Sequence, residues 1–355
     1  MALNYFRHQE YFSIYGLGSK FIVGYVLVSL GILLAAAGGS WDITNHLLNK
    51  PETFFALPHA ILYSGAGSAI AGAVLIFSCS RTPAASKMTW PVRLVIAGVL
   101  TLICAGPVDF GWHSAFGLDG LLSPPHFALV SGMLASSAGS LACLFQITKR
   151  LLPSALVVIA ILPVWLAASG MIDMFSLPFS ETKYFNFNPE PTLGVTAATL
   201  TFPFLISMSL VGSSVLASKR FGVLTITGAS FIIVGILTSI IPNSTLIPTI
   251  PFYMSSMIPI VSADALLAYS RSRLSLYAAG AIAGLTFFML YYPLIIYTYN
   301  EAFERKIIWP SLIMMTYFEM IRNVLPLVAL PAAAMGIFGA IIGNRITLNK
   351  KIDYG

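Results

Sequence analysis

The feature that most constrains this chain is a series of long apolar segments separated by short stretches that hold most of the charged residues. A helix needs roughly 20 mainly apolar residues to cross the hydrocarbon core of a bilayer, and only helices or closed barrels satisfy their backbone polar groups there. Ten such segments cover about residues 20–41, 58–79, 91–108, 125–147, 153–174, 191–217, 221–241, 249–269, 274–297 and 323–343. The sequence therefore predicts an all-α, polytopic integral membrane helix bundle with about ten transmembrane helices.

The composition and the distribution of charge agree with a protein surrounded by a lipid bilayer. Only 9% of the 355 residues are charged and 57% are hydrophobic, whereas a soluble domain carries about 25% charged residues. The net charge of +6 does not indicate nucleic-acid binding, because the basic residues lie in short clusters between apolar segments. Fourteen of the 19 Lys and Arg residues fall on one side of the predicted bundle. The positive-inside rule then predicts a multi-pass protein of the cell (plasma) membrane with both termini in the cytoplasm.

A motif occurs twice in the first half of the chain. The stretch WDITNHLLNKPETFFALPHAILYSG begins at Trp41, and DFGWHSAFGLDGLLSPPHFALVSG begins at Asp109. Aligned without a gap, both follow the pattern D-x3-H-x5-[DE]-x5-P-H. The equivalent pairs are Asp42 and Asp109, His46 and His113, Glu52 and Asp119, and His59 and His126. Because four of the chain's five histidines occupy these positions, the motif indicates an internal repeat.

A weaker third copy follows, and it suggests how the chain is divided. Asp173 ends the fifth segment and Glu190 opens the sixth, with Leu177 where a histidine would stand. We interpret the first six spans as three related helical hairpins, of which the third is degenerate. This interpretation predicts a metal-binding membrane domain over residues 1–220. Residues 221–355 would then be C-terminal membrane helices used for packing or for subunit contact.

The spacing within each copy predicts a metal site. Asp and His at positions i and i+4 share one face of a helix, and a proline suits the first turn of the helix that returns. Each hairpin can therefore direct one carboxylate and two imidazoles to one place, and such a set leaves coordination positions open. Ionisable groups in membrane segments are costly and usually functional, and a divalent cation compensates them.

These arguments assign two roles to the residues of the motif. The predicted metal ligands, near the outer face of the membrane, are Asp42, His46, His59, Asp109, His113 and His126. The predicted catalytic residues, which would transfer protons, are Glu52 and Asp119.

The D-x3-H-x12-H spacing, within about residues 20–150, resembles the copper site in the C subunit of the copper membrane monooxygenases. That family includes the particulate methane, ammonia and hydrocarbon monooxygenases, and its C subunit carries a second motif of similar form after the first. The resemblance implies a copper-dependent oxidoreductase that activates dioxygen and receives a small apolar or neutral substrate through the lipid. It also implies other membrane subunits, or a homo-oligomer, as partners.

Other interpretations of the motif stay open at this point. The Asp and His side chains can fasten each hairpin by buried hydrogen bonds alone. Asp and His ligands also suit zinc or iron, which would make the chain a di-zinc or di-iron membrane enzyme. A non-catalytic metal-binding or structural subunit of a membrane complex is a further alternative. A transporter is disfavoured, because its ionisable groups would lie along a path through the middle of the membrane.

Overall fold

The protein is an all-α bundle that spans a membrane several times. The computed structural model describes residues 18–48, 50, 53–80, 89–117, 119–147, 154–270, 272–291, 318, 322–323 and 325–352. Within these ranges, ten helical segments are long and apolar enough to cross a membrane. The β-structure found there is one isolated bridge between Glu181 and Asn186. The predicted fold class is confirmed.

The first six spans are single helices. Their bounds are α2 (Gly18–Leu47), α3 (Leu57–Ser80), α4 (Thr89–Phe116), α5 (Pro124–Ile147), α6 (Ser154–Ser176) and α7 (Pro191–Leu216). Helices α2 and α4 continue past residues 41 and 108, where the apolar segments were expected to end. The leading Asp and His of each motif copy therefore lie in the final turns of a helix.

The later spans are less regular. They comprise α8 (Val223–Ile240), the 3-10 helix η2 (Ser244–Thr249), α9 (Ile250–Ser255), α10 (Met257–Tyr269), α11 (Arg273–Gly284), α12 (Thr286–Leu290) and α15 (Leu325–Ile352). The span predicted at 249–269 is thus divided between η2, α9 and α10. Pro248 lies inside η2 and Pro251 in the first turn of α9, and a proline cannot supply the backbone N–H of a continuous helix. Residues 292–297, the end of the ninth predicted span, lie outside the described residues.

Small residues bring the paired helices of the first two hairpins into backbone contact. A Cβ added to Gly31 of α2 would meet the carbonyl oxygen of Gly65 in α3 at 2.6 Å. In the second hairpin, a Cβ on Gly98 of α4 would meet the carbonyl oxygen of Gly132 in α5 at 2.7 Å. Membrane helices approach this closely where their interfaces are built from small residues. The contacts fix each helix pair along its length, and so fix the ends that carry the motif.

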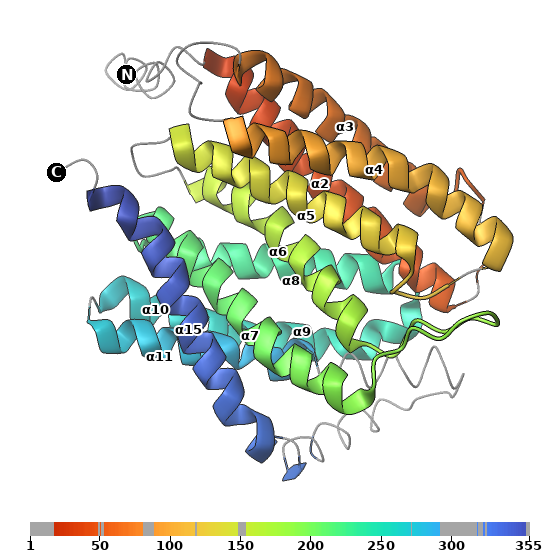
Figure 1. Ribbon diagram of the computed structural model, residues 1–355. Helices are drawn as coiled ribbons and strands as arrows, with labels where there is room; N and C mark the ends of the chain where they lie inside the picture. The colour runs from red at the N-terminus through yellow and green to blue at the C-terminus, as the bar shows by residue number, and fades with distance from the viewer. Residues whose placement is uncertain are drawn as a thin grey trace.

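The bundle has two regions that share α6, α7 and α8. Figure 1 shows α2, α3, α4 and α5 side by side in one region, and α7, α10, α11 and α15 in the other. Buried apolar side chains form two clusters. One is built mainly from α2–α6, and the other joins α6, α7 and α8 to the later helices. The second cluster therefore draws on both sides of residue 220, and the boundary predicted there stays a prediction.

The close packing of α2 on α3 gives a test with an internal control. Gly65→Val places a branched side chain where even a Cβ would lie 2.5 Å from the backbone nitrogen of Ala35. We expect the free energy of unfolding to fall by about 1–3 kcal/mol, the usual cost of overpacking. Gly67→Val in the same helix is the control, because a Cβ there meets nothing within 4 Å. Unfolding in detergent, followed by circular dichroism, measures both variants, and equal stabilities would contradict the packing role of Gly65.

Candidate metal centre

The six predicted ligands converge at one end of the bundle. Asp42 and His46 lie near the end of α2, and His59 lies in the first turn of α3. In the same way, Asp109 and His113 lie near the end of α4 and His126 in the first turn of α5. The hairpin geometry brings both sets to the side of the bundle opposite the start of α2 and the end of α15 (Figure 1).

The first set forms a compact triad. Oδ2 of Asp42 lies 3.5 Å from Nε2 of His46, and Oδ1 of Asp42 lies 3.0 Å from Nε2 of His59. One ligand atom from each of the three side chains lies within 4.8 Å of the others, a spacing that could hold a metal ion. Asp42 and His46 are buried, while His59 is half-buried.

The second set repeats this arrangement, except that one carboxylate oxygen faces both imidazoles. Oδ1 of Asp109 lies 3.4 Å from Nε2 of His113 and 3.3 Å from Nε2 of His126. Oδ1 of Asp109 and Nε2 of His113 are buried and, apart from these longer contacts, have no hydrogen-bond partner among the described residues. Unpaired buried polar atoms are costly, so the triad has atoms that a ligand such as a cation would satisfy.

The second nitrogen of each imidazole faces a backbone carbonyl. A carbonyl oxygen only accepts hydrogen bonds, so Nδ1 carries a hydrogen and Nε2 is the nitrogen that would bind a metal ion. The Nδ1 distances are 3.1 Å from His46 to the oxygen of Asp119, 2.9 Å from His59 to Thr53, 3.3 Å from His113 to Gly117 and 2.8 Å from His126 to Gly120. Histidines that bind metals are commonly oriented in this way. The hydrogen bonds therefore present all four Nε2 atoms to the two carboxylates.

Two glycines shape the loop that supplies three of these carbonyls. Gly117 directly follows α4 and has φ at +79°, a conformation that residues with a side chain disfavour, and its carbonyl oxygen faces His113. Gly120 lies against the connection after α6, where a Cβ would come within 1.3 Å of the carbonyl oxygen of Phe179. The N–H of Leu121 donates to that same oxygen at 2.7 Å. The loop is thus held in place by a segment distant in the sequence.

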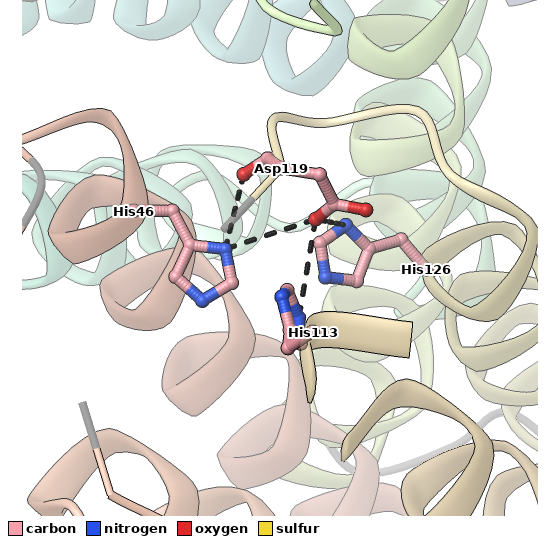
Figure 2. Close-up of side chains that lie close together, drawn as sticks. All are labelled: His46, His113, Asp119 and His126. Atoms are coloured by element: carbon pink, nitrogen blue, oxygen red, sulfur yellow. Dashed lines mark hydrogen bonds and ion pairs between the residues drawn. The ribbon is translucent and has the colours of Figure 1, made fainter. Parts of the chain in front are cut away.

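Asp119 lies among the histidines, as Figure 2 shows. Its Oδ1 is 3.5 Å from Nδ1 of His126, and 3.9 Å from both Nε2 of His113 and Nδ1 of His46. These four side chains form a second group that could hold a metal ion, and His46 belongs to both groups. The rings of His46 and His113 are in edge contact, with centroids 4.7 Å apart. The two sets are therefore contiguous.

The chemical position of Asp119 differs from that of the other two carboxylates. It is 4% exposed, and neither carboxylate oxygen has a hydrogen-bond partner in the described part of the chain. It faces the N–H edge of His46 and His126 rather than their Nε2 atoms. Asp119 is therefore placed to orient and polarise these imidazoles, and its proton-transfer role stays a prediction. Glu52, its predicted counterpart, lies outside the described residues.

The predicted third copy does not join the centre. Asp173 near the end of α6 and Glu190 belong to neither group of candidate ligands. Glu190 caps α7, because its carboxylate accepts hydrogen bonds from the N–H of Leu193 at 2.9 Å and the hydroxyl of Thr192 at 3.1 Å. Its bonds to the backbone of Leu193 and Thr192 lower the pKa of Glu190. Asp173 instead lines a cavity that also touches Asp42 and His126.

No protein-family model, curated protein or solved structure matches this chain. Its class is therefore defined by its own fold and site. It is a polytopic helical membrane protein with a cluster of His and Asp side chains that could hold a metal ion.

The position of Asp119 behind the imidazoles can be tested by a nearly isosteric change. Asp119→Asn removes the negative charge, and we expect metal affinity to fall about 10–100-fold, the usual effect of losing a group that supports the ligands. The Kd is measured by competition with a chelator of known affinity. Glu190→Gln, which removes an exposed carboxylate outside the cluster, is the control and should bind as the parent protein does. Parental affinity in a folded Asp119→Asn variant would contradict this role.

Proposed function

We propose that the His/Asp cluster binds copper and that the chain is a copper-dependent integral membrane oxidoreductase of the monooxygenase type. The observation that carries the proposal is the convergence of four imidazoles, each with Nε2 directed at a buried or half-buried carboxylate. Imidazole nitrogen suits copper, zinc, iron and nickel alike. The preference for copper comes from the resemblance of D-x3-H-x12-H to the copper membrane monooxygenases.

Each triad supplies the ligands for one ion. Asp42, His46 and His59 would hold the first ion. Asp109, His113 and His126 would hold the second. A 2-His-1-carboxylate set leaves positions open for dioxygen. Burial of the cluster limits access of water and strengthens the electrostatic interactions within it.

The reaction that fits such a centre is insertion of one oxygen atom into a C–H bond. Overall, R–H, O2, two electrons and two protons give R–OH and water. A C–H bond and the O–O bond break, a C–O bond and O–H bonds form, and an external two-electron reductant is oxidised. Copper supplies the one-electron chemistry with dioxygen. Asp119, 3.5 Å from Nδ1 of His126, is the carboxylate of this chain placed to hold and return a proton.

The location of the cluster supports a membrane-borne substrate. It lies at the end of transmembrane helices, beside a mainly apolar cavity of about 310 Å³. We propose that a small apolar or neutral substrate reaches it from the lipid. We place the cluster near the outer membrane face, with both termini in the cytoplasm, on the distribution of Lys and Arg.

Metal analysis tests the proposed centre directly. The protein is purified into lipid nanodiscs through a tag that contains no histidine, because nickel resins would load the site. We expect copper in the parent protein by inductively coupled plasma mass spectrometry. His46→Ala and His113→Ala should each lose about half of it or more, because each removes a ligand from one triad.

The control for this experiment is His8→Ala, which removes the one histidine outside the motif. It should retain the parental copper content. Zinc or iron in place of copper would overturn the copper assignment in favour of a di-zinc or di-iron enzyme. Unchanged metal content in both ligand variants would overturn the centre itself.

Oxygen consumption tests the activity separately. Copper-loaded protein with a two-electron reductant and a short alkane should consume O2 and form the alcohol in equal amounts. We expect His46→Ala and His113→Ala to fall to the background rate. Copper bound with the parental ligand dependence but without product from the parent protein would favour a non-catalytic metal-binding subunit.

A further inference from the structure

The cavity beside the His/Asp cluster contains one acidic side chain that is not part of the cluster. Its volume is about 310 Å³, within the range of small-molecule sites. Side chains from α2, α5, α6 and α8 form most of its wall, and they are predominantly apolar. Asp42 and His126 of the centre line it as well. From α6 comes Asp173, an acidic side chain set in an apolar wall.

The carboxylate of Asp173 has no hydrogen bond or ion pair with another residue in the part of the chain that the structure describes. Several hydroxyl groups of the wall are already engaged, although that of Ser169 has no hydrogen-bond partner among the described residues. The hydroxyl of Tyr291 contacts that of Ser176, and the hydroxyls of Ser40 and Thr238 are bonded to each other. Leu177, one turn beyond Asp173, is apolar and also lines the cavity. The cavity therefore offers one isolated acidic group.

We propose that this cavity binds a small organic amine in its cationic form, with the ammonium group on Asp173. Asp173 is half-buried, and a carboxylate in an apolar wall is stabilised in its charged form when an opposite charge pairs with it. Aromatic rings also attract cations, and Phe202, Phe231 and Tyr253 lie in the same wall. A neutral apolar molecule would fill the volume and leave the carboxylate unpaired.

The alternative of a third metal site is weaker. A stable site needs several ligands. At Asp173 the position equivalent to a histidine is Leu177, and among the residues that line the cavity the one histidine is His126.

The proposal rests on the proposed function in one respect. Because Asp42 and His126 share the cavity, the bound amine would lie beside the proposed metal centre, as a ligand distinct from its neutral substrate.

Binding is tested on the full-length protein in nanodiscs with tritiated 2-phenylethylamine and with propylbenzene, its neutral counterpart of similar shape. Empty nanodiscs correct for partition into lipid. We expect saturable amine binding to the parent protein. Asp173→Asn should weaken it at least about tenfold, because a charged hydrogen-bonded pair is lost, while propylbenzene binding changes little.

A second variant blocks the cavity without touching the charge. Gly170 of α6 lines the cavity, and the nearest atom to an added Cβ is Cγ1 of Val130, in ordinary contact at 3.8 Å. Gly170→Val should therefore fold and reduce binding of both probes. Amine binding that is unsaturable in the parent protein, or equally tight in Asp173→Asn, would overturn the proposal.

Metal content separates this proposal from the proposed function. Asp173→Asn should retain the copper of the parent protein, since Asp173 belongs to neither group of candidate ligands. If the parent protein binds the amine but holds no copper, the metal centre fails and the amine site stands. If copper is held in the triads and the amine does not bind, the amine site alone fails.

Discussion

The main physical constraint on this structure is that acidic groups are removed from water at the ends of its membrane helices. Their negative charge must be compensated by other groups. Withdrawing a carboxylate from water costs several kcal/mol unless a partner restores the lost interactions. In the described part of the chain, the ion pairs of Asp109 and Asp119 are made with histidines alone. A divalent cation bound between these carboxylates and the Nε2 atoms of the imidazoles would balance this charge. The helices, the loop and the cavity are arranged around that requirement.

The positions of the ligands follow from close helix packing and from loop backbone. Contacts between Gly31 and Gly65, and between Gly98 and Gly132, set the helix ends of each hairpin at a fixed separation. The carbonyl groups beyond those ends then orient the imidazoles by accepting from Nδ1. Packing in the middle of the membrane and hydrogen bonding at its edge therefore act on the same side chains. A change deep in a helix pair would alter the centre without touching a ligand.

Local sequence predicted what depends on local spacing. The i, i+4 relation places His46 beside Asp42 on any helix, and a proline followed by His59 marks the start of the returning one, so the convergence of each set was predictable. The position of Asp119 was not, because the loop that carries it is fixed by Phe179, from a connection far along the chain. The division of the eighth span and the cavity beside Asp42 likewise depend on contacts between distant helices. The positions of the prolines indicated the division of the span but not the cavity.

The position of Asp173 follows from the same need to compensate a carboxylate, in a place where no histidine is available as a partner ligand. In the first two sets, the carboxylate lies one turn before a histidine, whereas Leu177 occupies that place after Asp173. Without an imidazole there, the carboxylate cannot share a cation with a set of its own, and it lines the cavity instead. In its charged form, a carboxylate without a fixed metal ion is stabilised by a mobile cationic counterpart. An exchangeable organic cation meets that need, since the cavity beside the His/Asp cluster has room for one next to Asp173.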